Sequence, residues 1–145
     1  MRAIAFSASR DSIAATLPAL RPTIEPMPGD EDILRAAYRA FNARDVGAAV
    51  ELMHPEVDWP NAWEGGRVIG REAVTAYWAR QFESISSTVE PKAFDRELDG
   101  SVTVTVRQVV RDAKTNELLS DAKVLHRYRL ENGLVARMDV LDSAG

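Results

Sequence analysis

Apolar residues recur at the spacing of a helix between residues 30 and 85. Three helices are predicted, over residues 30–42, 46–54 and 71–85. The apolar stripe of the first consists of Ile33, Leu34, Ala37, Tyr38 and Phe41. Asp45 is placed to cap the second helix, and Pro55 is expected to end it. Glycines 65, 66 and 70 mark a loop before the third helix.

After residue 86 apolar residues alternate with polar ones, which indicates strands with one buried face. Four strands are predicted, over residues 89–98, from residue 102 onward, over 118–130 and over 134–141. Turns are predicted at Asp99-Gly100, Thr115-Asn116 and Glu131-Gly133. A further short strand is predicted at Val57–Trp59. Helices followed by an antiparallel meander predict an α+β fold, in which three helices pack on a curved antiparallel sheet and enclose a cone.

The 145 residues are long enough for one domain, but residues 1–29 differ from the rest. They are rich in proline and show weak periodicity, so we expect a disordered or extended tail before a domain at residues 30–142. Two alternatives remain open, a transit peptide and a start at Met27. Arg10-Asp11 interrupts any signal-peptide core, so we expect a cytoplasmic protein.

Charge and composition exclude several classes of function. The net charge is −4 and no basic run is present, which argues against nucleic acid as a partner. No apolar run approaches the roughly 20 residues that cross a bilayer, so no membrane partner is expected. The chain has no cysteine, which excludes disulfides and thiolate chemistry. Its two histidines, His54 and His126, lack the spacing of metal ligands, and we predict neither metal nor cofactor.

Strand parity and the inner side of the predicted third helix bring polar-tipped aromatic and amide side chains to the inside of the predicted cone. The predicted ligand-binding residues are Trp59, Asn61, Trp63, Tyr77, Trp78, Gln81, Gln108, Tyr128, Met138 and Asp142, and the predicted catalytic residue is His126. Trp63 is expected over the entrance and Asp142 at the mouth. Tryptophan, tyrosine and histidine combine an apolar body with a polar tip, which suits a small apolar molecule with one or two carbonyl or hydroxyl oxygens.

Four stretches carry a resemblance to a known superfamily. They are Y-R-A-F-N-A-R-D from Tyr38, L-M-H-P-E-V-D-W from Leu52, G-R-E-A-V-T-A-Y-W from Gly70 and H-R-Y-R-L-E-N-G-L-V-A-R-M-D from His126. Together they resemble the superfamily that contains ketosteroid isomerase, the SnoaL-like polyketide cyclases and nuclear transport factor two, over roughly residues 30–142. The resemblance implies a cystatin-like α+β roll and closest similarity to SnoaL-like domains of unassigned function.

The resemblance does not carry over the chemistry of the steroid isomerase. That site uses an aspartate base and an oxyanion hole made by a tyrosine and a protonated aspartate. The matching positions hold Asn61, Ala37 and His126, so all three roles are changed. Tyr38 follows the tyrosine position by one residue, which turns it by about 100° around the helix. We therefore expect no steroid isomerisation.

Two hypotheses of function follow. The first is an isomerase, cyclase or dehydratase without cofactor that acts on a small carbonyl or polyketide-like compound, with His126 as proton shuttle and Asn61 and Gln108 as hydrogen-bond donors. The alternative is a non-catalytic ligand-binding or accessory domain of the same fold. In that case His126 is a core histidine satisfied by Gln108, Asn61 or a backbone carbonyl.

The outer face of the sheet is the predicted site of assembly. Asp58 and Asp139 should point outward, and Asp139 is expected to pair with Arg107 or Arg137. Three helices cannot cover both faces of four long strands, so we expect a homodimer through the outer face. In polyketide cyclases of this fold an acidic residue on a late strand or loop does acid/base work, which Asp142 matches, but a solvated terminus is the favoured explanation of Asp142.

Overall fold

A computed structural model describes residues 29–141 and contains three helices and six strands. The helices are α1 (Asp30–Asn42), α2 (Val46–Glu51) and α3 (Arg71–Ser84). The strands are β1 (Met53–Pro60), β2 (Arg67–Ile69), β3 (Ile85–Arg96), β4 (Val102–Asp112), β5 (Leu118–Glu131) and β6 (Leu134–Leu141). The tail predicted over residues 1–29 lies outside the described residues except for Gly29, and so does Asp142.

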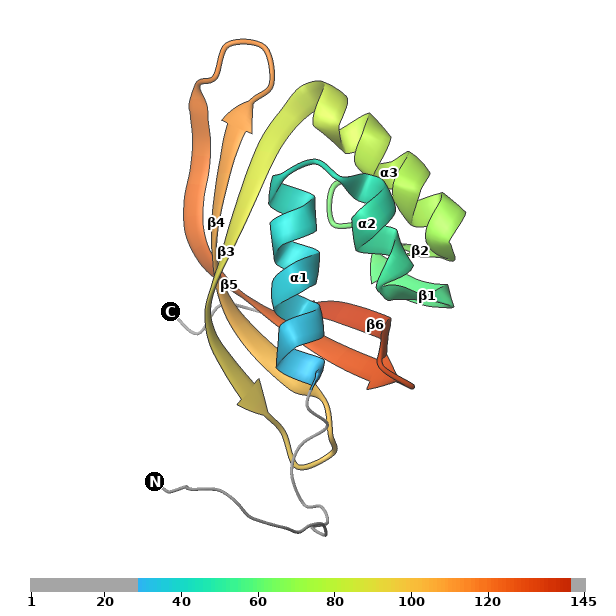
Figure 1. Ribbon diagram of the computed structural model, residues 1–145. Coiled ribbons are helices and arrows are strands. Elements are labelled where there is room, and N and C mark those ends of the chain that lie inside the picture. Colours follow the sequence, from blue (N-terminus) through green and yellow to red (C-terminus); the bar gives the residue numbers. More distant parts are fainter. Residues whose placement is uncertain (1–28, 142–145) are drawn as a thin grey trace, which may run out of the picture. The chain divides into compact units, whose positions relative to one another are not determined.

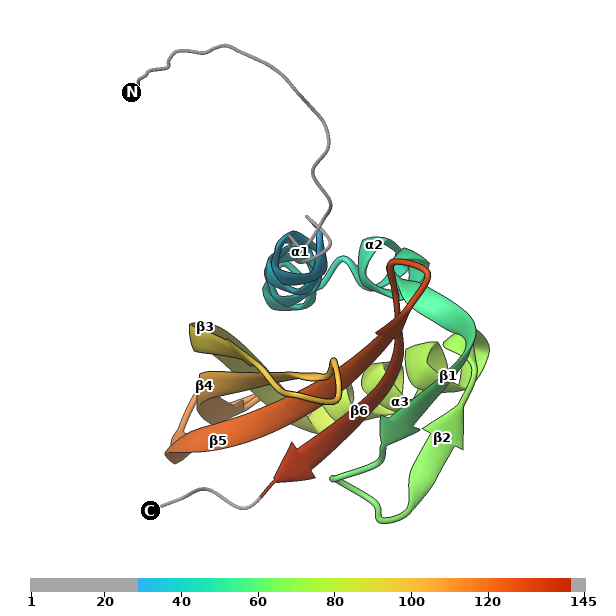
Figure 2. The same cartoon turned by 90° about the horizontal axis from the view of Figure 1, so that it is seen from below.

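The strands form one curved, unclosed sheet in the order β2-β1-β6-β5-β4-β3, with the helices packed against one face (Figures 1 and 2). This confirms the predicted α+β fold. The prediction of a wholly antiparallel sheet was wrong in one place, because β1 pairs with β6 in parallel. That pairing joins the short β1–β2 hairpin to the long ribbon of β3, β4 and β5, and it closes one side of the space beneath the helices.

The chain leaves α2 earlier than its apolar pattern predicted. The Asp45 side chain accepts a hydrogen bond from Ala48 N at 3.1 Å, which confirms the predicted cap. The helix then ends at Glu51, and Pro55 lies inside β1 instead of ending a helix. Leu52 O accepts a hydrogen bond from Val135 N at 2.9 Å, so pairing with β6 takes over from the helix at this point.

Two strand boundaries also differ from the prediction. The three residues of β2 were expected to be loop, because so short a segment between glycines shows no period. Strand β3 begins at Ile85, four residues before the predicted start at Val89, because it pairs with β4 as far as Asp112. The side chain of Asn42 at the end of α1 bonds both Val89 N, at 2.9 Å, and Val89 O, at 2.7 Å.

Apolar side chains from every layer form a single core between helices and sheet. Its most deeply buried members are Leu34, Met53, Val57, Val74, Val104, Val106 and Val135. Val104 and Val106 are the inward positions of the alternation predicted for β4, while Thr105 between them is less buried. Among the described residues, no helix is long and apolar enough to cross a membrane.

The outer face of the sheet carries paired charges across β2, β1 and β6. Asp58 and Asp139 both lie there, and Arg137 contacts the two carboxylates at 2.8 and 2.9 Å. Arg67 also pairs with both of them. Arg107 pairs instead with Asp121, at 2.7 Å. The prediction that Asp139 pairs with Arg107 or Arg137 therefore resolves in favour of Arg137.

Candidate functional site

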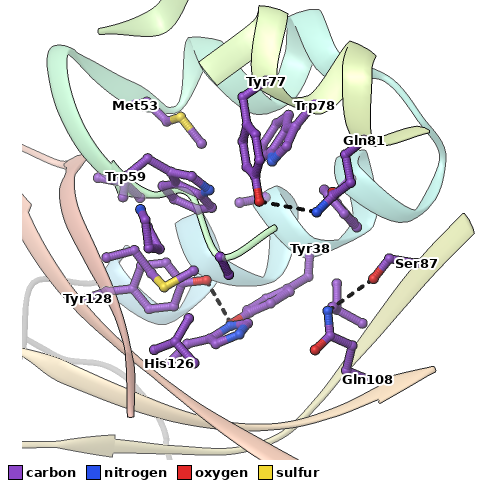
Figure 3. A pocket seen from close by; sticks show the side chains of 18 residues that line it. Tyr38, Met53, Trp59, Tyr77, Trp78, Gln81, Ser87, Gln108, His126 and Tyr128 are labelled. Atoms are coloured by element: carbon purple, nitrogen blue, oxygen red, sulfur yellow. Dashed lines mark hydrogen bonds between the residues drawn. The ribbon is translucent and has the colours of Figure 1, made fainter. Parts of the chain in front are cut away.

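A cavity of about 150 Å³ lies between the helices and the concave face of the sheet (Figure 3). Its wall is largely aromatic and aliphatic, with polar tips contributed by tyrosine, histidine, glutamine and serine. The lining residues are Ala37, Tyr38, Phe41, Met53, Trp59, Pro60, Ala62, Tyr77, Trp78, Gln81, Ser87, Val89, Gln108, His126, Tyr128, Val135, Met138 and Val140. Within the part of the chain that the structure describes, none of the lining residues is Asp, Glu, Lys or Arg.

Most of the residues that the sequence analysis predicted for the site line this cavity. They are Trp59, Tyr77, Trp78, Gln81, Gln108, His126, Tyr128 and Met138. Asn61 and Trp63 are not among the lining residues. Asp142 lies outside the described residues. The alternation of β4, β5 and β6 therefore located the inner wall, and the two departures both fall in the turn between β1 and β2.

Asn61 is engaged in that turn instead of facing the cavity. Its Nδ2 donates to Glu64 Oε1 at 3.0 Å, and its Oδ1 accepts from Glu64 N at 2.7 Å. Glu64 in turn pairs with Arg80 of α3 at 2.9 Å. The strand ends at Pro60, so the parity that placed Asn61 inside does not extend to it. The expected oxyanion donor is a residue that fixes the turn.

Trp63 occupies the same turn and is 42% exposed. Its contribution to the site is through the backbone, because its N–H donates to the hydroxyl oxygen of Tyr77 at 3.3 Å. Gln81 Nε2 donates to the same oxygen at 3.2 Å. The turn is thereby attached to α3 at the wall of the cavity.

His126 lies on β5 with its ring in a chain of buried hydrogen bonds. The Tyr128 hydroxyl donates to the Tyr38 hydroxyl at 2.8 Å, and Tyr38 lies 2.9 Å from His126 Nδ1. With Tyr128 as the first donor, Tyr38 donates to Nδ1 and the ring proton lies on Nε2, whereas the reverse direction of the chain places that proton on Nδ1. The rings support the arrangement, with Tyr38 and His126 only 10° from parallel and Tyr128 edge-on to both.

Tyr38 is the site residue that sequence comparison missed. Counting from the isomerase put the tyrosine position at Ala37 and turned Tyr38 away. Both residues line the cavity, because α1 presents a broad face to the concave sheet. The signal was present in the apolar stripe, in which Leu34, Tyr38 and Phe41 recur at helical spacing. Ser87, buried on β3 and bonded by Gln108 Nε2 at 3.1 Å, was also missed.

Burial sets the protonation of this group. It lowers the pKa of His126 from 6.5 to about 4, so the imidazole is neutral at pH 7. Burial also raises the pKa values of Tyr38 and Tyr128, so both phenols keep their protons. The site therefore consists of neutral groups that donate and accept hydrogen bonds. The hypothesis that His126 is satisfied by Gln108, Asn61 or a backbone carbonyl is replaced by its bond to Tyr38.

Residues 29–141 contain no group of three or more histidine, aspartate and glutamate side chains close enough to hold a metal ion. The polar groups at the cavity wall are hydroxyls, amides and one imidazole. Such groups can donate hydrogen bonds to, and accept them from, a molecule in the cavity.

A helical layer on a curved mixed sheet, with a cavity between them, defines the class of cone-shaped α+β proteins. The sequence profile described as a SnoaL-like domain matches residues 34–138, and the chain belongs to this family. Among curated proteins none matches.

Solved structures share the fold at low identity. An NTF2-like protein of unknown function from Burkholderia pseudomallei is 21% identical, with a TM-score of 0.70 over 81% of this chain and 92% of that one. A candidate polyketide cyclase from Sinorhizobium meliloti is 20% identical, with a TM-score of 0.63 over 76% and 94%. RV0760c from Mycobacterium tuberculosis, in complex with estradiol-17beta-hemisuccinate, is 17% identical, with a TM-score of 0.67 over 79% and 93%.

Proposed function

We propose that this protein binds a small, largely apolar compound through a carbonyl or hydroxyl oxygen, and that His126 Nε2–H donates the hydrogen bond that orients it. The observation that carries the proposal is the buried hydrogen-bond chain that joins Tyr128, Tyr38 and His126 Nδ1. The proposal takes Tyr38 as the donor in its bond to Nδ1, which leaves the ring proton on Nε2 of a side chain that lines the cavity.

The donor at Nε2 has no protein acceptor among the described residues. His126 is only 7% exposed, so bulk water does not replace that acceptor freely. A buried donor left without a partner costs about 1–3 kcal/mol. An oxygen of a bound molecule removes this cost, and the surrounding aromatic wall supplies the apolar contact that such a molecule needs.

The same geometry favours hydrogen-bond donation over proton transfer at His126. A neutral imidazole whose pKa is about 4 is a weak base at pH 7. If Nε2 gave up its proton, the hydrogen-bond chain would replace it from Tyr38 and finally from Tyr128, whose pKa is raised by burial. A neutral histidine can still polarise a carbonyl, as it does in triosephosphate isomerase. Catalysis in this cavity, by an isomerase, cyclase or dehydratase without cofactor, would therefore rest on carbonyl polarisation.

Size and relatives support a ligand built on rings. The cavity volume of about 150 Å³ matches that of an engineered protein cavity that binds benzene. RV0760c holds a steroid derivative, and a designed binder of 17-OHP shares the fold at a TM-score of 0.65 and 16% identity. In this protein Val140 lines the cavity and is 46% exposed, so part of a larger ligand can extend past it toward solvent.

Calorimetric titration with acetophenone, a single-ring ketone, tests the proposal. We expect the wild-type protein to bind it and the His126→Phe variant to bind at least about fivefold more weakly, because one buried hydrogen bond is lost. The control is His54→Gln, which changes the other histidine, on β1, and should leave binding unaltered. Equal affinity in wild type and His126→Phe would remove His126 from the proposal.

The homodimer remains a second part of the proposal. The outer face of β4 exposes Arg107 and Arg111 beside half-buried Thr103, Thr105 and Val109, and the helices lie on the opposite face of the sheet. Twofold association would bury the half-covered threonine and valine side chains. Sedimentation equilibrium at micromolar concentration should give the mass of two chains, and a single-chain mass would exclude this interface.

A further inference from the structure

The cavity contains a second buried donor, on α3, that the proposal above does not use. Tyr77 is 2% exposed and lines the cavity. Its oxygen accepts from Trp63 N and from Gln81 Nε2, at 3.3 and 3.2 Å. The backbone of Ala62 also interacts with this oxygen, so its acceptor capacity is used and only its own proton is left to bond.

The proton of Tyr77 remains in place at neutral pH and has no acceptor among the residues that the structure describes. Burial raises the pKa of the phenol, so it stays a donor. Figure 3 shows Tyr77 reaching from α3 into the cavity, while His126 lies on the sheet at the other side. The phenol of Tyr77 and the proposed donor of His126 therefore lie on different walls of one cavity.

A third polar group on the cavity wall is the hydroxyl of Ser87. Ser87, 1% exposed, accepts from Gln108 Nε2 at 3.1 Å, so its own proton is available as well. Donors thus come from β3, α3 and β5, without any cation among the described lining residues. Such a wall matches a neutral molecule with several acceptor oxygens better than an anion or an amine, because charge would be desolvated without a counter-charge.

We propose that the ligand of this cavity carries acceptor oxygens at two separated positions of a ring system, as a diketone or quinone does, with one oxygen on His126 Nε2–H and the other on Tyr77 O–H. This inference rests on the proposed function and narrows its ligand class. It makes Tyr77 a second specificity-determining residue, and it predicts that a compound with only one oxygen leaves one buried donor unpaired.

The test compares two probes of nearly identical shape, 1,4-diacetylbenzene and 4-isopropylacetophenone. In the second probe an isopropyl group replaces one acetyl group, so the shape is kept and one acceptor is lost. In calorimetric titration of the full-length wild-type protein we expect the diketone to bind about fivefold more tightly, as one additional hydrogen bond requires. This comparison needs no variant.

Variants then assign the second donor. The double variant Tyr77→Phe/Gln81→Leu removes the phenol and also the amide that could donate in its place. The two probes should then bind with about equal affinity. Gln81→Leu alone keeps the phenol and should keep the preference, as should Met138→Leu, which changes only the apolar wall. Thermal melts of each variant establish that it is folded.

The outcomes separate the two proposals. If both probes bind the wild type with equal affinity, the two-acceptor inference is overturned while single-oxygen binding stands. If Gln81→Leu alone abolishes the preference, the second donor is the amide and the assignment to Tyr77 is overturned. If neither probe binds the wild type, the proposed function fails and the inference fails with it.

Discussion

The two faces of one sheet carry polar groups of opposite character. On the outer face Asp58, Asp139 and Arg137 form ion pairs that remain partly exposed. On the inner face Tyr38 and His126 form neutral hydrogen bonds from which water is largely excluded. The difference follows from burial, because a charge is costly to desolvate whereas a neutral pair is satisfied by a single hydrogen bond. The inner face is therefore suited to an uncharged ligand.

The strongest test of this contrast places the same charge on either face of β4. Val104→Asp puts a carboxylate into a fully buried position opposite His126 in the sheet. We expect it to lower the free energy of unfolding by more than about 4 kcal/mol or to prevent folding. Thr105→Asp, one residue along and less buried, should cost clearly less, because its carboxylate keeps part of its hydration. Urea denaturation of both variants gives the comparison, and equal costs would contradict it.

Acid provides the next largest effect. The pKa of His126 falls from 6.5 in the unfolded chain to about 4 in the folded one. Between these values the unfolded chain binds more protons, so stability rises with pH across this window and is lost as the pH falls through it. The loss from this group should reach about 3 kcal/mol. In His126→Phe the dependence between pH 6.5 and 5 should flatten, and an unchanged slope would contradict the assignment.

Loss of the central hydroxyl should have an intermediate effect. Tyr38→Phe leaves His126 Nδ1 and the Tyr128 hydroxyl without their partner. We expect a cost of about 2 kcal/mol in urea denaturation. Tyr128→Phe removes only one end of the chain and should cost about half as much. A larger cost for Tyr128→Phe would show that Tyr38 is not the centre of the network.

Changes to the outer face should have the smallest effect. Arg137→Gln removes contacts with both Asp58 and Asp139, at 2.8 and 2.9 Å. Partly exposed ion pairs of this kind contribute about 0–1 kcal/mol and are screened by salt. We expect a change within that range that shrinks further in 0.5 M sodium chloride. A cost comparable to that of Tyr38→Phe would erase the contrast between the faces.

The sequence predicted the fold well because its signals are local. The alternation in β4 identified Val104 and Val106 as inward, and the same parity in β5 identified His126 and Tyr128. The parallel pairing of β1 with β6 and the short β2 were not predictable, since each depends on contacts between distant segments. The predicted α2 was too long for the same reason. Leu52 O accepts a hydrogen bond from Val135 N of β6, a contact between distant segments that ends the helix early.

The site was predictable where the strands and the third helix are regular. Asn61 was expected to be a donor in the cavity because parity was extended past Pro60, where a turn has already begun. Tyr38 was not predicted to be a site residue. It follows the tyrosine position of the isomerase by one residue, and on a helix that offset rotates the side chain by about 100°. A buried face of α1 wide enough to include both Ala37 and Tyr38 follows from packing against a concave sheet, which the sequence does not display.

That His126 is a neutral donor with its proton on Nε2 is tested most directly by nitrogen NMR of the labelled wild-type protein. The spectrum contains only two histidines, and His54→Gln assigns the other. We expect the His126 ring to show a protonated Nε2 and an unprotonated Nδ1 at pH 7, and to titrate at about 4. A ring protonated at Nδ1, or one that titrates near 6.5, would contradict both the direction of the hydrogen-bond chain and the donor proposed for the ligand.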